Sequence, residues 1–199
     1  MNDILKLKEI NKRNIIFDLD GTIIDSASGI IKSIEKAFKK YNVNPKTQIN
    51  HTLIGPPIRE TINNILEEKD KKSLDLILCY FIQYYDAYGY KNSNLYPSIL
   101  ETLITLEKKH DIYIATNKRF KPTIKILKLL KIEKYFNKIF TLDMLKSKGV
   151  SKSDLLIELI KEMNIDRNDC VYVGDRTEDE KAASINKIEF IRAKWGYIN

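Results

Sequence analysis

Short apolar runs alternate with amphipathic segments along most of this 199-residue chain. The first run, residues 14–19, is rich in β-prone Ile and Phe and predicts a strand that is covered on both faces, as in a parallel sheet. Similar short runs follow at 112–115, 138–140, 170–173 and 189–191, and the segments between them have apolar residues at helical spacing. This alternation predicts an α/β fold with a parallel sheet and right-handed crossover helices.

The interval between residues 25 and 92 departs from this alternation, because it contains no convincing strand. Its first helical segment follows Ser26, a candidate N-cap, and the Gly55-Pro56-Pro57 break separates that segment from two more, 58–68 and 73–88. We therefore predict an α/β core made of residues 1–24 and 93–199, with an all-α cap, residues 25–92, inserted after the first strand.

Two carboxylates, Asp18 and Asp20, stand where the first apolar run stops, and Gly21 and Thr22 follow them. Alternate side chains of a strand point the same way, so the two carboxylates share a direction. Two anions this close repel one another unless a cation lies between them, and hard carboxylate oxygens suit Mg²⁺. A surface Asp-Gly turn is the alternative, but such turns seldom follow so hydrophobic a run.

The polar residues that follow the later strands are expected to meet these carboxylates, because ligands of open α/β sheets bind outside the carboxyl ends of the strands. Thr116, Asn117 and Lys118 follow the run at 112–115, and the segment Gly174-Asp175-Arg176-Thr177-Glu178-Asp179 follows the run at 170–173. Together with a lysine from the interval that contains Lys146, Lys148 and Lys152, these are groups that can hold a phosphoryl group beside Mg²⁺.

In order and type, these residues resemble the four motifs of the haloacid dehalogenase-like superfamily of phosphohydrolases, over nearly the whole chain. Asp-x-Asp-Gly-Thr is complete at 18–22, Thr116 closes a strand, and Gly174, Asp175 and Asp179 match Gly-Asp-x-x-x-Asp. The helical insertion resembles the cap of the phosphoglycolate phosphatase-like branch. The resemblance implies a Rossmann-like, three-layer core with this cap inserted after the first strand.

The resemblance also implies catalytic roles. Asp18 would attack phosphorus and form an aspartyl-phosphate, and Asp20 would protonate the leaving oxygen and later take a proton from water. The Asp18 carboxylate, the Asp20 main-chain carbonyl and Asp175 would hold Mg²⁺, while Asp179 would orient waters on the metal. Thr116 and a lysine would stabilise charge on the phosphoryl oxygens.

The identity of that lysine is open on sequence, because the chain lacks the Lys-Pro pair often found in the family. Lys146, Lys148 and Lys152 compete, and we choose Lys152 because Lys152-Ser153-Asp154-Leu155 stands at a predicted helix start and matches a Lys-x-x-Leu variant; a surface lysine is the alternative. Arg59 resembles a cap residue that reaches toward substrate, although a solvent-exposed helix charge explains it equally well. Asn117 is a candidate phosphoryl ligand, and Lys118 is expected at the rim of the site.

Composition adds three expectations. The formal charge of +7 comes from scattered lysines without a basic, aromatic-interleaved block, so we expect no nucleic-acid partner, and a small anionic substrate explains the charge equally well. Cys79 and Cys170 lie in apolar surroundings and predict buried thiols in a reducing compartment. Without an apolar stretch that could span a bilayer or resemble a signal peptide, we expect no membrane association and a cytoplasmic location.

These expectations describe a Mg²⁺-dependent phosphomonoester hydrolase that acts on a small phosphorylated metabolite, such as phosphoglycolate or a nucleoside monophosphate. A phosphomutase or other phosphotransferase would share the same residues and differ in its acceptor. A non-catalytic binding protein of the same fold is disfavoured, because Asp18, Asp20, Asp175 and Asp179 are all present. Monomer and homodimer both stay open.

Overall fold

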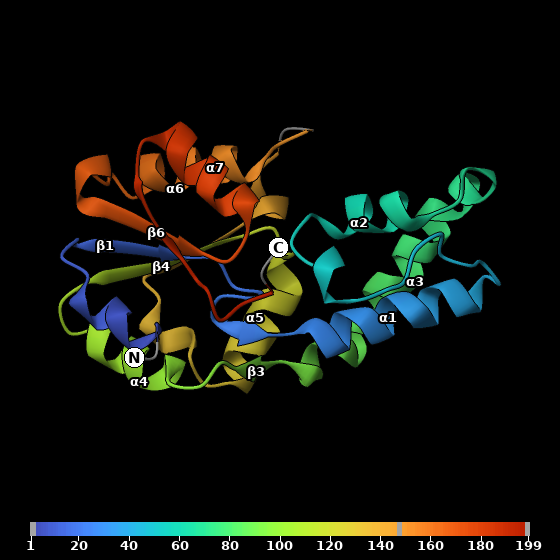
Figure 1. Cartoon of the computed structure of the whole chain (residues 1–199), viewed down its shortest axis with the longest axis horizontal. Helices are drawn as coiled ribbons and strands as arrows, with labels where there is room; N and C mark the ends of the chain where they lie inside the picture. Colours follow the sequence, from blue (N-terminus) through green and yellow to red (C-terminus); the bar gives the residue numbers. More distant parts are fainter. Residues whose placement is uncertain (1–2, 147–148, 198–199) are drawn as a thin grey trace.

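The computed structural model describes residues 3–146 and 149–197, and its centre is a five-stranded sheet in which every neighbouring pair is parallel. The strand order is β5-β4-β1-β6-β7, so the first strand lies in the middle (Figure 1). The strands are β1 (Asn14–Phe17), β4 (Asp111–Thr116), β5 (Lys138–Thr141), β6 (Cys170–Gly174) and β7 (Glu189–Arg192). The predicted α/β fold is confirmed.

Helices cover both faces of this sheet, so the core has three layers, with the sheet in the middle. The alternation of β1 decides what each face buries: Ile15 and Phe17 pack with α4 (Ile99–Leu106) and α5 (Phe120–Leu129), whereas Ile16 packs with α6 (Lys152–Glu162) and α7 (Thr177–Asn186). All three β1 side chains are almost completely buried. The uninterrupted apolar run of β1 therefore reflects a strand with two covered faces.

The insertion forms a second lobe (Figure 1) with helices α1 (Ala27–Lys40), α2 (Ile58–Ile65) and α3 (Leu74–Ala87). It has its own hydrophobic cluster, which includes Phe38, Ile62 and Phe81. The chain enters it through β2 (Ile24–Asp25) and leaves through β3 (Asn94–Leu95), and these two strands pair antiparallel. That pairing supports our cap boundaries at residues 25 and 92, which stay a prediction.

Short 3-10 helices connect the main elements: η1 (Leu5–Glu9), η2 (His51–Leu53), η3 (Glu68–Ser73), η4 (Gly89–Asn92), η5 (Glu133–Tyr135), η6 (Leu142–Met144) and η7 (Arg167–Asp169). The helix predicted at 58–68 ends earlier, at Ile65, because Leu66 is extended and forms a β-bridge with Pro45. Ser26 takes the N-cap position of α1, but its side chain makes no capping hydrogen bond; the Asp25 carboxylate accepts from the Ala27 amide instead, at 3.0 Å.

The two cysteines differ in burial. Cys170 is buried in β6, as predicted, but Cys79 is exposed, so the prediction of a buried thiol there is wrong. Helix α3 buries Ile77, Phe81 and Tyr85, which are spaced four residues apart, and Cys79 lies between them on the opposite face.

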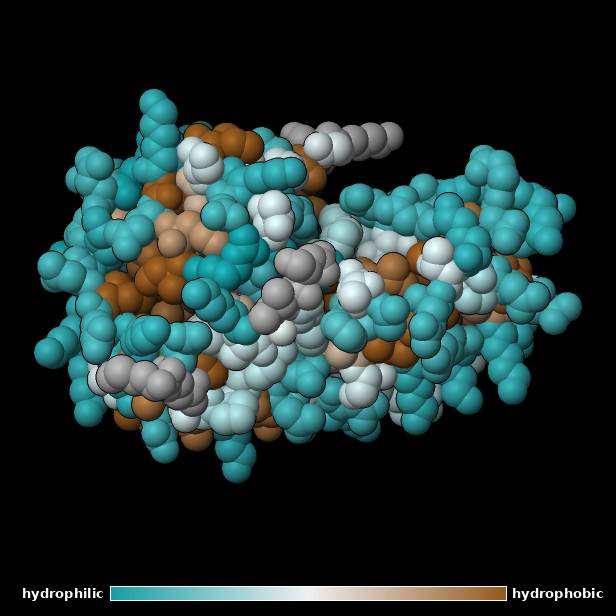
Figure 2. All heavy atoms as spheres, in the orientation of Figure 1, coloured by the Kyte–Doolittle hydropathy of each residue, from teal (hydrophilic) through white to brown (hydrophobic). Residues whose placement is uncertain are grey.

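Hydrophilic side chains are spread over both lobes in the view of Figure 2, with smaller hydrophobic areas among them. Within the described residues, no helix has both the length and the apolar character needed to cross a membrane. The cytoplasmic location and the choice between monomer and homodimer stay predictions.

Candidate active site

Five of the predicted site residues meet at the carboxyl ends of the three central strands. Asp18 directly follows β1, and its amide donates to Val173 of β6 at 2.9 Å, which extends the strand pairing by one residue. The other four are contributed by β4, the loop after β6, and the starts of two helices: Thr116, Asp175, Lys152 and Asp179. All five are buried, with exposed fractions of 0–3%. The strand order predicts this meeting, because β4, β1 and β6 are neighbours.

Lys152 lies between two of the carboxylates. Its Nζ is 3.0 Å from Asp18 Oδ1 and 2.7 Å from Asp179 Oδ1. A capping box formed by Ser151 and Asp154 fixes the start of α6, so that the first residue of the helix reaches back into the site. Burial opposes the charge on Lys152, but the Asp179 and Asp18 carboxylates outweigh it and raise the pKa of its ammonium group.

Of the two competing lysines, Lys146 lies away from the site. Lys146 is exposed and lines a surface groove that contains none of the site carboxylates. Lys148 lies outside the described residues. The choice of Lys152 as the phosphoryl-binding lysine therefore gains geometric support.

Three carboxylates, those of Asp18, Asp175 and Asp179, have oxygens within 4.8 Å of one another. Both oxygens of Asp179 are engaged, Oδ1 by Lys152 and the Tyr172 hydroxyl and Oδ2 by the amide of Arg176. By contrast, Asp175 Oδ1 is buried without a hydrogen-bond partner among the described residues, and Asp18 Oδ1, also buried, has only the ion-pair contact with Lys152 Nζ at 3.0 Å. Asp175 therefore has an oxygen available for a cation, Asp18 shares its Oδ1 with Lys152, and Asp179 contacts Lys152; that Asp179 orients waters on a metal stays a prediction.

This crowding affects the protonation of the acids. Burial raises the pKa of Asp18, while Lys152 opposes the rise. Burial, and next the neighbouring Asp179, raise the pKa of Asp175 to about 6. Gly21 has a φ of +79°, and a Cβ there would overlap the Asp175 carboxylate, so only glycine allows this approach. Three clustered carboxylates with one lysine among them leave an excess of negative charge, and such clustered hard oxygens fit a divalent cation; that the cation is Mg²⁺ stays a prediction.

Asp20 points toward the cap lobe and has different partners. Both of its oxygens lie 2.9 Å from Lys118 Nζ, and the Ser26 hydroxyl donates to Oδ1. Lys118 Nζ also lies 4.9 Å from the ring centroid of Tyr85 in α3. The expectation that Lys118 lies at the rim is wrong: only 5% of its side chain is exposed. Burial opposes its charge, but Asp20 raises the pKa of Lys118 above its usual range.

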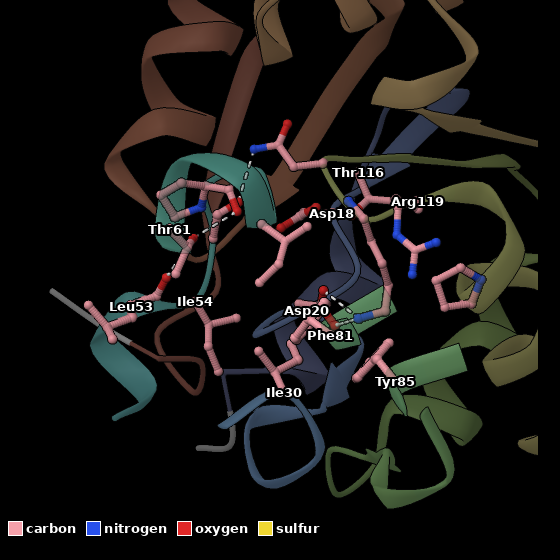
Figure 3. A pocket seen from close by; sticks show the side chains of 16 residues that line it. Asp18, Asp20, Ile30, Leu53, Ile54, Thr61, Phe81, Tyr85, Thr116 and Arg119 are labelled. Atoms are coloured by element: carbon pink, nitrogen blue, oxygen red, sulfur yellow. Dashed lines mark hydrogen bonds and ion pairs between the residues drawn. The ribbon is translucent and has the colours of Figure 1, made fainter. Parts of the chain in front are cut away.

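A cavity of about 60 Å³ lies between the two lobes. Asp18, Asp20 and Thr116 line it from the core (Figure 3). On the cap side the lining side chains are mainly apolar, and they are contributed by α1, the 50–57 loop, α2 and α3: Ile30, Leu53, Ile54, Pro56, Ile58, Thr61, Phe81 and Tyr85. The cavity therefore combines a charged wall with a hydrophobic one.

The structure does not bring Arg59 to this cavity. Arg59 is exposed on α2, forms an ion pair with Asp75 of α3, and lines a second, open groove between the cap and the core, which shares Asn117 and Arg119 with the cavity. The α2 residues that line the cavity are Ile58 and Thr61, and Thr61, two residues after Arg59, lies on the opposite side of the helix from it. Asn117 does line the cavity, and its side-chain amide donates to the Gly55 carbonyl at 3.0 Å and contacts Glu178.

Residues near the C-terminus also support the site, which the sequence analysis missed. The Tyr197 amide donates to Asp175 Oδ2 at 3.0 Å, and its hydroxyl accepts from the Ser26 amide at 2.7 Å. Trp195 donates from its indole nitrogen to the Thr22 carbonyl at 2.8 Å. Their position after the last strand, β7, could have indicated this role, because residues that follow the strands of an open α/β sheet lie near its ligand site.

Comparison with known proteins agrees with this geometry. The haloacid dehalogenase-like hydrolase family profile matches residues 15–193. The tyrosine-protein kinase PtkA of Mycobacterium tuberculosis H37Rv is 31% identical over 92% of this chain, but the match spans only 62% of that protein. The phosphoglycolate phosphatase of Aquifex aeolicus is 30% identical, over 94% of this chain and 86% of that protein.

Solved structures give the same result. The haloacid dehalogenase-like family protein SP0104 from Streptococcus pneumoniae superposes with a TM-score of 0.84 at 25% identity, covering 94% of this chain and 87% of that one. The family match over 15–193 contains β4, β6, all but the first residue of β1, and all five of the buried site residues. This chain belongs to the haloacid dehalogenase-like hydrolase family.

Proposed function

We propose that this protein is a Mg²⁺-dependent phosphomonoester hydrolase that acts on a small phosphorylated metabolite through an aspartyl-phosphate. One observation carries the proposal: a buried carboxylate, Asp18, lies beside the Lys152 ammonium and lines the cavity between the two lobes. A carboxylate in such a position can attack phosphorus, because the adjacent cations offset the repulsion between two anions.

The residues divide the reaction into two steps. Asp18 forms a bond to phosphorus while the bond to the leaving oxygen breaks, and Asp20 supplies the proton that this oxygen needs. Water then attacks the aspartyl-phosphate, Asp20 takes the proton, and Asp18 is released. Thr116 and Lys152 stabilise charge on the phosphoryl oxygens during both steps.

The unpartnered Asp175 Oδ1 and its closeness to the Asp18 carboxylate support a bound cation held by these two acids, and the Asp20 main-chain carbonyl is the third protein ligand that we propose. When bound, Mg²⁺ supplies positive charge that neutralises the carboxylates and the phosphoryl oxygens. Asp179 acts through Lys152, which it contacts at 2.7 Å.

The size and lining of the cavity favour a small leaving group, since side chains such as Ile54 and Phe81 close the cap side. Phosphoglycolate is the first substrate to test, followed by nucleoside monophosphates. The proposal is tested by assaying phosphoglycolate, nucleoside monophosphates and para-nitrophenyl phosphate with and without Mg²⁺. Release of inorganic phosphate that depends on Mg²⁺ is expected, and its absence for every ester would contradict the proposal.

A phosphotransferase is the second candidate, and the resemblance to PtkA, whose name describes a tyrosine kinase, favours it. The two candidates share Asp18 and Asp20 and differ in what accepts the phosphoryl group. Single-turnover experiments with a labelled phosphate ester separate them: hydrolysis transfers the label to inorganic phosphate, whereas a transferase places it on an added sugar phosphate or protein tyrosine.

A further inference from the structure

We propose that Arg176 and Asn117 are positioning residues that hold the cap loop 50–57 over the cavity and thereby limit the size of the leaving group. The inference rests on the proposed function, because it concerns which phosphate ester the same cavity accepts. Four consecutive residues of this loop line the cavity: Leu53, Ile54, Gly55 and Pro56.

Arg176 reaches the loop from the core. It directly follows Asp175, only 7% of it is exposed, and its Nη2 donates to the Thr52 carbonyl at 2.9 Å. Gly55 lies against the same guanidinium: its φ is +136°, and a Cβ there would be 2.6 Å from Arg176 Nε. The loop can therefore approach the arginine this closely only with glycine at this position.

Asn117 is the second core residue that binds the loop. It directly follows Thr116, and its Nδ2 donates to the Gly55 carbonyl at 3.0 Å and lies 3.2 Å from both carboxylate oxygens of Glu178. The two core residues thus bind main-chain carbonyls of the loop, and each is adjacent in sequence to a residue of the phosphoryl site. The position of the apolar cavity wall is consequently set relative to the phosphoryl group.

A separate contact keeps the whole cap lobe in place. The Arg119 guanidinium pairs with the Asp86 carboxylate of α3, and Lys125 Nζ donates to the Asp86 carbonyl at 2.6 Å. Loss of Arg176 or Asn117 is therefore expected to loosen the 50–57 loop while the lobes stay together. Such a local change widens the cavity on its apolar side.

The test compares Arg176→Met and Asn117→Ala with Arg13→Met, a matched control at the amino ends of the strands, far from the site, where Arg13 is exposed and pairs with Asp111. Hydrogen–deuterium exchange is measured for peptides that cover 50–57, and kcat/KM is measured for phosphoglycolate and for the bulkier para-nitrophenyl phosphate. Both test variants are expected to raise exchange in the loop and the kcat/KM ratio of bulky to small ester about tenfold, the factor expected for one lost hydrogen bond.

The outcomes separate this inference from the proposed function. Equal losses of kcat/KM for both esters, with unchanged exchange at 50–57, would overturn the positioning role in an active enzyme. If the wild-type protein hydrolysed neither ester, the proposed function would fail, and the inference that rests on it would fail too, even if exchange in the loop rose. Asn117→Ala provides an independent variant if Arg176→Met does not fold.

Discussion

The two walls of the cavity between the lobes are built in opposite ways. On the core side, ionisable groups are buried in pairs, with Lys152 against Asp18 and Lys118 against Asp20. On the cap side, the described lining residues of the 50–57 loop, α1, α2 and α3 carry no charge, and the 50–57 loop is held through its main chain. The difference suggests a division of labour, in which core residues set the rate for every ester and cap residues select among esters.

The largest effect should come from the core wall. Asp18→Asn keeps the shape of the side chain but removes the attacking carboxylate, so Mg²⁺-dependent hydrolysis should fall at least about 10³-fold for both small and bulky esters. Steady-state kinetics checks this result, and circular dichroism checks that the fold is intact. Asp111→Asn, at the amino end of β4 and away from the site, is the matched control. Turnover by Asp18→Asn within about tenfold of the wild-type rate would exclude Asp18 as the nucleophile.

Lys152→Met should reduce both activity and stability. The substitution leaves Asp18 and Asp179 buried without their shared cation, so the free energy of unfolding should fall by about 3 kcal/mol and kcat by about 10²-fold. Urea unfolding and steady-state kinetics measure the two effects, with the exposed Lys128→Met as a control. Near-normal turnover of Lys152→Met, together with loss of activity in Lys148→Ala, would assign the role to Lys148 instead.

The carboxylate cluster should make stabilisation by Mg²⁺ depend on pH. The pKa of Asp175 is raised from 3.8 to about 6 in the folded state, so the stabilisation from its proton is complete below pH about 4 and is lost as the pH rises through about 6. Mg²⁺ replaces that proton, so its effect on Tm should be larger at pH about 7.5 than at pH about 5. Differential scanning fluorimetry measures this, and the pH dependence should weaken in Asp175→Asn.

The smallest effect is expected for the cap arginine that the family resemblance suggested. Arg59 is exposed, paired with Asp75 and absent from the cavity lining, so Arg59→Ala should change kcat/KM for phosphoglycolate less than about twofold, as is usual for exposed ion pairs. A tenfold rise in KM would mean that the cap does contribute a charge to substrate binding. The description of the cap as the uncharged wall of the site would then be wrong.

Much of the core wall could be predicted from sequence, because its signals are local. The apolar run of β1 stops at Asp18, the strand at 112–115 leads to Thr116, and Lys152 stands at a helix start. Each of these residues occupies a strand end or a helix start, and parallel topology brings such positions together.

The remaining contacts depend on residues far apart in sequence. Lys118 was expected at the rim, but Asp20 and Tyr85, the latter on a cap helix, enclose it. The support that Tyr197 gives to Asp175 joins the end of the chain to the loop after β6. No local pattern encodes which side chains of a cap helix meet the core. Cys79 is a different case, because the four-residue spacing of the buried α3 residues already places it on the opposite face.

The short pairing of β2 with β3 has a consequence for how such proteins can change. Asp25 and Asn94 are direct partners across this ladder, so the chain leaves the core and returns to it within about 5.5 Å. A tight two-residue turn can span that gap as well as a whole helical lobe can. Evolution, or an engineer, could therefore exchange the lobe for another insertion without altering the strand order, and the selectivity of the enzyme could diverge while its chemistry is retained.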